Sequence, residues 1–212
     1  LSMTLMDLRV ADRKPQTEKD SIWDAESQAV VWRHRRKNGE VIEMEVVWSP
    51  LAFHGRLSAL AMATDVTVRR RAAHQNAVFG KLSHQLSAAT VASAAAMFIC
   101  EAADELFHWD DFSLDLYDPS REEVISLLTI TTLEGQRVQV PAVPELQTTK
   151  ALVQRVMTRG AELISADETG SRKGTTMIAP IRKGESVIGV LFIQNRLSGS
   201  YSERDLHTLQ TL

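Results

Sequence analysis

The sequence predicts an α+β chain in which an antiparallel sheet, a helical linker and a second antiparallel sheet with flanking helices follow one another. Three observations support this order. Alternating apolar and polar residues, broken by turn residues, predict strands in residues 29–66 and again from residue 112. Between these stretches, residues 67–107 change to a helical period. The final stretch predicts another helix, because Ser202 is a favoured N-cap residue and Glu203 and Asp205 follow it in the first turn.

The composition is that of a globular protein with one or two domains. The chain has 212 residues, of which 44% are hydrophobic and 24% charged. A net charge of -3 gives no overall attraction to nucleic acid or anionic membranes, and we interpret the basic runs 33–37 and 69–71 as solvated surface. No apolar run approaches the ~20 residues that span a bilayer. We therefore expect a cytoplasmic protein with neither nucleic acid nor membrane as its partner. A start at Leu1 suggests a piece of a longer protein.

The first sheet is expected to contain three strands, at residues 29–36, 41–50 and 57–66. Asn38-Gly39 predicts a hairpin turn between the first two, because both residue types accept a positive φ. His54-Gly55 leads into the third strand, which completes an antiparallel meander. Residues 1–28 are polar and irregular and are too poor in apolar residues to fold alone.

The linker is predicted to be a helix with a narrow apolar seam. Pro and Gly are absent from residues 67–78, and Gly80 is the one weak point. Apolar residues recur every seven positions, which favours helix pairing, so we expect a homodimer with Phe79, Leu82 and Leu86 at its seam. The two rows of this repeat are Ala72, Phe79 and Leu86, and Gln75, Leu82, Ala89 and Ala96. A second helix is expected from about Val91 to Phe107.

The second sheet is expected to be built from two hairpins with a helix between them. Strands are predicted at 112–117 and 123–132, followed by a loop at Pro141 and Pro144. A helix over 146–158 should end at Gly160, with a short strand at 161–165 and a polar loop at 167–174. The second hairpin comprises 175–181 and 187–194. The last helix carries an apolar stripe of Tyr201, Leu206, Leu209 and Leu212.

The first sheet resembles the end of a PAS domain. The segments that carry this resemblance are Trp32 to Glu40, Ser49-Pro50-Leu51 with Gly55, and Asp65-Val66-Thr67. The last of these is similar to the exit motif that, in PAS domains, couples the final strand to the outgoing helix. The resemblance implies that residues 1–66 are the C-terminal part of a PAS domain, with Met3 to Arg13 as its mid-domain segment. Asp65 and Thr67 would then be the exit-motif residues, and 67–88 the helical linker.

Residues 89–212 resemble a GAF domain. The matching pieces are Ala103 to Leu106 with Trp109, Ser113 to Asp118, Ala179-Pro180-Ile181, Val187 to Leu191, and Tyr201 to Leu206. The resemblance implies an antiparallel sheet flanked by helices. It also implies a pocket that could hold a small ligand.

Together the two resemblances imply a non-catalytic sensory module of a bacterial signal-transduction protein. Such a module would bind a small ligand or dimerise, and would act on a downstream output domain such as a histidine kinase or a diguanylate cyclase. The alternative is a cyclic-nucleotide-binding regulatory module of a cyclase, phosphodiesterase or transcription activator. GAF domains of that class carry an Asn-Lys…Phe…Asp-Glu signature, where this chain has Asn195-Arg196, Tyr201 and Asp205-Leu206. If the chain binds no cyclic nucleotide, these residues are expected to cap the last strand and the last helix, as in any GAF domain. A scaffold with a filled core is a third interpretation.

The sequence contains no recognisable catalytic or metal-binding set. Cys100 is the single cysteine, which excludes an internal disulfide and argues against a thiolate metal site and two-thiol reduction, and we expect it to be buried. The six histidines are scattered without metal-ligand spacing, and His84 lacks the neighbours of a phosphorylation site. Asp110-Asp111 is interpreted as a solvated cap. The ligand, any cofactor and the output domain are not identified by the sequence.

Overall fold

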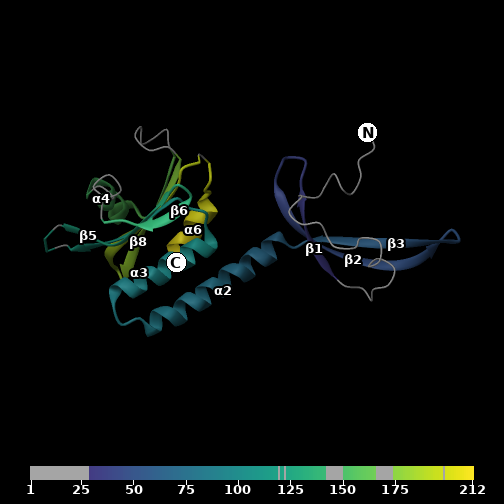
Figure 1. Ribbon diagram of the computed structural model, residues 1–212, viewed down its shortest axis with the longest axis horizontal. Helices are drawn as coiled ribbons and strands as arrows, with labels where there is room; N and C mark the ends of the chain where they lie inside the picture. Colours follow the sequence, from purple (N-terminus) through teal and green to yellow (C-terminus); the bar gives the residue numbers. More distant parts are fainter. Residues whose placement is uncertain (1–28, 119, 122, 142–149, 166–173, 198) are drawn as a thin grey trace. The chain divides into compact units, whose positions relative to one another are not determined.

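The computed structural model describes residues 29–118, 120–121, 123–141, 150–165, 174–197 and 199–212. The chain divides into two compact units, Leu1–Gln75 and Asn76–Leu212. The first contains an antiparallel three-stranded sheet and the second an antiparallel six-stranded sheet flanked by helices (Figure 1). The predicted α+β class, with two separate sheets, is therefore confirmed.

The sheet of the first unit is the expected meander, in the order β1 (Val30–Arg35), β2 (Val41–Phe53), β3 (Arg56–Asp65). One of its two turns is as predicted and the other differs. His54 and Gly55 both have positive φ, 48° and 73°, and form the tight connection between β2 and β3. At the other turn Gly39 has a φ of 90° while Asn38 is not in the positive-φ region. The amide of Arg36 donates to the carbonyl of Glu40 across three residues, so the loop is longer than the predicted two-residue turn.

Helix α2 covers Thr67–Ala88, the range predicted for the linker helix. The predicted seven-residue repeat does not continue beyond it, because α2 ends before Ala89 and the chain turns into α3 (Ala92–Leu106). Ala96 therefore belongs to a different helix from Leu82 and is buried in the core of the second unit. The predicted apolar seam was too long, because the seven-residue repeat was counted across the turn between α2 and α3.

The second half of α2 packs against α3 within one chain. Val78 and Leu82 of α2 form a buried cluster with Ala102 of α3. Leu86, Phe98, Ile99, Leu106 and Leu212 pack against this cluster. An ion pair between Lys81 and Glu105 joins the same two helices at their surface. This stretch of α2 is thus an integral part of the second unit.

The six-stranded sheet has the strand order β6-β5-β4-β9-β8-β7. Its strands are β4 (Asp111–Asp118), β5 (Glu123–Leu133), β6 (Gln136–Gln139), β7 (Glu162–Ser165), β8 (Thr175–Lys183) and β9 (Ser186–Asn195). The sequence interpretation missed β6 and treated this region as loop. The missed signal was Glu134-Gly135, a two-residue turn in which both residues have positive φ, 50° and 79°.

Helices cover both faces of this sheet. Helices α3 and α6 (Glu203–Thr211) lie on one face, and α4 (Lys150–Arg159) lies on the other (Figure 1). The predicted helix ends are confirmed. Ser202 and Asp205 form a reciprocal capping box at the start of α6, and Gly160, with a φ of 94°, follows the last residue of α4.

The sequence expectations for residues 1–28, for Pro144 and for most of the loop 167–174 lie outside the described residues. Among the residues that are described, no helix is both long and apolar enough to cross a membrane.

Candidate functional site

The two faces of the six-stranded sheet differ sharply in chemistry. The α3/α6 face is apolar and contributes Phe112, Leu114, Met177, Leu191 and Ile193 to one core cluster. On the α4 face, the apolar side chains lie mainly on β8 and β9, where Ile178, Val190 and Phe192 pack with α4. The neighbouring part of that face, on β4 and β5, is built from polar side chains that are nevertheless buried, apart from the half-buried Ser126. We call this set the polar face, and it comprises Asp111, Ser113, Asp115, Ser126, Thr129 and Thr131.

Strand register explains why these polar residues gather. Ser113 is opposite Thr129 on β5 and opposite Phe192 on β9, and Asp115 is opposite Ser126 and Val190. Because directly opposed residues point to the same side of a sheet, all of them share the α4 face. Asp115 and Ser113 are only 1% and 2% exposed. Since burial of a carboxylate is costly unless it is compensated, this is an unusual composition for a covered face.

The polar face is partly bonded within its own strands. The hydroxyl of Ser113 donates to Asp115 Oδ2 at 3.0 Å, and the hydroxyls of Ser126 and Thr129 lie 3.0 Å apart. A carboxylate offers about four acceptor positions, and a hydroxyl can both donate and accept. The arrangement can therefore present both donors and acceptors to a small polar molecule.

At one end of the polar face, Arg196 holds three strands together. Its guanidinium contacts Asp111 at 3.0 Å, the hydroxyl of Thr131 at 3.1 Å and the carbonyl of Thr132 at 2.9 Å. The hydrogen bonds that its guanidinium donates to Asp111 raise the pKa of Arg196 above its ordinary value. The backbone amide of Arg196 also donates to Asp110 at 2.7 Å. The interpretation of Asp110-Asp111 as solvated caps was wrong for Asp111, which is only 6% exposed.

A concavity lies on the opposite face, beside the end of α6. It has a volume of about 310 Å³, and its apolar lining includes Ile99, Ala179, Ile181, Leu191, Leu209 and Leu212. Arg182, Gln210 and Thr211 also line it, so its lining is mixed in polarity. The sequence could not indicate which sheet face carries a pocket, and the two faces turn out to offer different chemistry.

The residues that align with the cyclic-nucleotide signature serve local structure. The Asn195 amide donates to the carbonyl of His108 at 3.0 Å, and the Tyr201 hydroxyl donates to the same carbonyl at 2.7 Å. Burial, with a smaller effect of Asp110, raises the pKa of Tyr201. Asp205 accepts from the amide and hydroxyl of Ser202 in the capping box. These side chains cap strand and helix, as the simpler interpretation of the sequence held.

In the first unit, Asp65 and Thr67 join the last strand to α2. Asp65 Oδ1 accepts from the amide and the hydroxyl of Thr67, at 3.0 and 2.6 Å, and its Oδ2 accepts from Arg36 at 2.7 Å. The Thr67 hydroxyl in turn accepts from the amide of Glu43 at 2.9 Å. Hydrogen bonds from Thr67, followed in importance by the charge of Arg36, lower the pKa of Asp65. The start of α2 is thereby bonded to β2 and β3, and through Asp65 to Arg36, which follows β1.

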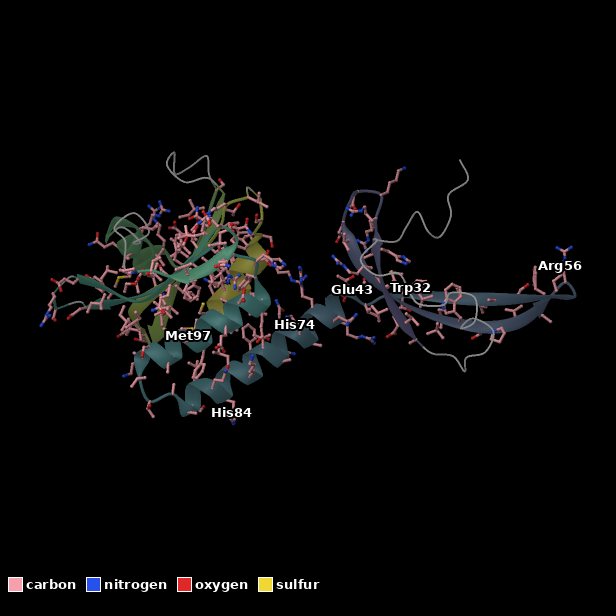
Figure 2. All side chains as sticks on the ribbon, in the orientation of Figure 1. Trp32, Glu43, Arg56, His74, His84 and Met97 are labelled. Atoms are coloured by element: carbon pink, nitrogen blue, oxygen red, sulfur yellow. The ribbon has the colours of Figure 1, made fainter. Side chains whose placement is uncertain are left out.

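The predicted seam residues lie in different surroundings. Leu82 is only 3% exposed and is already packed against α3, whereas Phe79 and Leu86 are partly buried. The homodimer through these residues stays a prediction. His84 is an exposed side chain on the same helix (Figure 2).

Cys100 lies in the core of the second unit. Burial raises the pKa of its thiol to about 12, so the thiol form prevails at neutral pH. Within the described ranges, no three His, Cys, Asp or Glu side chains are grouped so that they could hold a metal ion.

Comparison with solved structures identifies the fold of the second unit. The GAF domain of an Acinetobacter phosphoenolpyruvate-protein phosphotransferase matches with a TM-score of 0.50 and 18% identity, over 65% of this chain and 86% of that one. Free methionine-R-sulfoxide reductase from Neisseria meningitidis, solved with its substrate, matches with a TM-score of 0.51 and 15% identity, over 66% and 84%. The second unit thus has the GAF fold.

A longer match is the chromophore-binding domain of a bacteriophytochrome from R. palustris. It has a TM-score of 0.50 and 6% identity, over 87% of this chain and 70% of that one. No protein-family model matches the chain. No curated protein matches it either.

Proposed function

We propose that the second unit is a regulatory module that binds a small polar molecule on the polar face of its sheet. The observation that carries this proposal is the row of buried hydroxyl and carboxylate groups on β4 and β5, beside the apolar patch that α4 covers. Ligand sites typically combine apolar surface with a few convergent polar groups, and this face sets a row of buried polar groups beside apolar side chains. The polar groups that line the concavity on the other face, from Arg182, Gln210 and Thr211, belong to exposed residues.

The module is proposed to be non-catalytic. The similar reductase from Neisseria meningitidis shares the fold at 15% identity, but this chain has a single cysteine, whose thiol is buried. Thiol-disulfide chemistry needs a thiolate and a second thiol to resolve the intermediate. Cyclic nucleotides are a less favoured ligand class, since Asn195, Tyr201 and Asp205 are engaged in capping.

The first unit is proposed to be the C-terminal part of a PAS domain. Support comes from the bonded Asp65-Thr67 junction and from the match to the bacteriophytochrome domain, which covers more of this chain than the second unit contains. In this proposal the protein acts in bacterial signal transduction, in the cytoplasm. A ligand would change the packing of α2, and an output domain such as a histidine kinase or a diguanylate cyclase would respond.

The proposed ligand site is tested by NMR of the labelled chain with a library of small polar molecules, which includes cAMP and cGMP. Binders should perturb amides of residues 113–117 and 126–131 first. Thr129→Val removes one hydroxyl from the polar face while conserving side-chain shape, and should weaken binding about fivefold, because the lost bond is worth on the order of 1 kcal/mol.

Thr208→Val is the matched control. Thr208 is likewise buried, at 8% exposure, but it lies on α6 and donates to the carbonyl of Arg204. Perturbations centred on Ile99 and Leu209 instead, or binding that is equally sensitive to both substitutions, would contradict the proposed site.

A further inference from the structure

The connection between β9 and α6 is bonded to a buried side chain of β8. Its described residues are 196–197 and 199–202. The hydroxyl of Thr175, a residue that is only 2% exposed, accepts from the backbone amides of Gly199 and Ser200 at 2.8 and 3.3 Å. Because the acceptor lies inside the fold, the connection cannot shift without breaking these bonds or moving β8.

The same connection is held at both of its ends. At its start, a Cβ added at Gly174 would lie 2.7 Å from the Cα of Arg196, so the two backbones touch there. At its other end, the Tyr201 hydroxyl donates to the carbonyl of His108, two residues after α3. A closely packed segment of this kind passes a displacement on to its neighbours, because it has little room to absorb it.

Arg196 belongs to this connection, and its side chain lies at the end of the polar face. Its guanidinium donates to both carboxylate oxygens of Asp111, to the hydroxyl of Thr131 and to the carbonyl of Thr132. The Thr131 hydroxyl donates in turn to Asp111 Oδ1 at 2.5 Å. Hydrogen bonds between charged partners are the stronger class. Arg196 therefore links the polar residues of β4 and β5 directly to the connection.

Helix α6 continues the connection, and its far end reaches α2. Ser202 begins α6 with its capping box, and Leu206 and Leu209 are buried in the core between α6 and the sheet. Leu212, directly after α6, packs against the cluster that contains Leu82 of α2. A displacement of α6 would thus change the packing of the second half of α2.

We propose that Arg196 couples the polar face to α6. This inference rests on the proposed ligand site, because a molecule bound on the polar face would compete with Arg196 for Asp111 and Thr131. Weaker bonds to Arg196 loosen the connection and the first turn of α6, and stronger bonds have the opposite effect. Arg196 is thereby a positioning residue, which acts through the connection and not through contact with the ligand.

Amide hydrogen exchange of the full chain tests this coupling without any ligand. Thr131→Val removes the hydroxyl that is bonded to both Arg196 and Asp111. The amides of residues 206–209 should then exchange at least about fivefold faster, relative to the amides of β8. Thr131→Ser keeps the hydroxyl and should exchange at the wild-type rate.

Thr129→Val is the matched control for this experiment. Thr129 lies on the same strand and face as Thr131 with the same exposure of 6%, but its hydroxyl is bonded to Ser126. The relative exchange of α6 should therefore be unchanged in Thr129→Val. Equal acceleration by both valine substitutions, no acceleration by Thr131→Val, or the same acceleration in Thr131→Ser overturns the proposal.

Arg196→Met tests whether the effect passes through Arg196. The double variant with Thr131→Val should exchange no faster in α6 than Arg196→Met alone, and additive acceleration overturns the coupling. A molecule that perturbs the amides of residues 126–131 should also shift those of 203–206, and binding without this second shift overturns the coupling as well. Failure of every molecule to bind the polar face contradicts the proposed function instead, and the exchange rates still decide whether the coupling exists.

Discussion

At the scale of single residues, the Asp65-Thr67 pair provides the clearest link between sequence and local structure. The carboxylate of Asp65, two residues before the first residue of α2, accepts hydrogen bonds from the amide and the hydroxyl of Thr67. It also forms an ion pair with Arg36. Asp118 makes the same local bonds with the amide and hydroxyl of Ser120, at 2.9 and 2.6 Å, but at a strand end. One motif thus starts a helix in the first unit and ends a strand in the second.

We predict that Asp65→Ala loosens the first turn of α2. The substitution leaves the Thr67 amide without its acceptor, so NMR Cα shifts of residues 67–70 should move toward coil values. Because Thr67 and Arg36 lower the pKa of Asp65 below its ordinary value of 3.8, the carboxylate stabilises the fold above that pH. In wild type this contribution is lost as pH falls through the lowered pKa, and in the variant that pH dependence disappears. Asp118→Ala should leave α2 unaffected, and loosening of α2 in both variants would contradict the prediction.

The polar face shows what residue-level reading can and cannot find. The alternation of Asp111, Ser113 and Asp115 is visible in the sequence and correctly predicts a strand. Burial of its polar half was not predictable, because it depends on which strands neighbour β4 and on the helices that cover the sheet. The same reason explains the error at Asp111, whose partner Arg196 is distant in sequence.

At the scale of elements, two glycines differ in whether the surrounding structure has room for a larger side chain. A Cβ added at Gly189 of β9 would lie 2.4 Å from the backbone oxygen of Asp115, on the neighbouring strand. A Cβ added at Gly80 of α2 would meet no atom within 4 Å. Both glycines lie inside regular structure, yet only the first permits a close approach of two backbones.

We therefore predict opposite effects of the same substitution. Gly189→Ala should destabilise the second unit by about 1–3 kcal/mol, because the β4–β9 pair must separate to fit the methyl group. Gly80→Ala should stabilise the chain by about 0.5–1 kcal/mol, through the higher helix propensity of alanine. Urea unfolding followed by circular dichroism measures both changes. Destabilisation by Gly80→Ala would mean that this part of α2 requires a bend or a close contact.

Elements with strong local signals were predicted well, whereas the association of α2 with a second chain stays a prediction. The helix over Thr67–Ala88 and the N-cap at Ser202 were predicted from residue types alone. The seam of Phe79, Leu82 and Leu86 was predicted to face another chain, but Leu82 packs on α3 of the same chain. A seven-residue period shows that one face of a helix is apolar, and it does not show which helix covers that face. Leu82→Asp would consequently disrupt the second unit itself, so it is unsuitable as a test of dimerisation.

At the scale of the whole molecule, the two units differ in how their apolar residues are used. Among the residues that the structure describes, the second unit contains three buried clusters, whereas the sheet of the first unit contributes to none of them. Since burial of apolar surface is the main favourable term in folding, the second unit should be the more stable one. The tryptophans divide in the same way, because Trp109 is the single tryptophan of the second unit and Trp23, Trp32 and Trp48 belong to the first.

We predict that the chain unfolds in two steps, with the first unit losing its structure at a lower urea concentration. Trp109 is 4% exposed, has a cation–π contact with Arg137 at 3.8 Å, and should report the second step. In a variant with the other three tryptophans replaced by phenylalanine, fluorescence should follow only that step, and Gly189→Ala should shift it. Asp65→Ala should shift the first step alone. This shift is measured by circular dichroism, with the substitution made in the chain that keeps all four tryptophans. A single coincident transition for both probes would show instead that the units fold cooperatively, and α2 would then have to transmit stability between them.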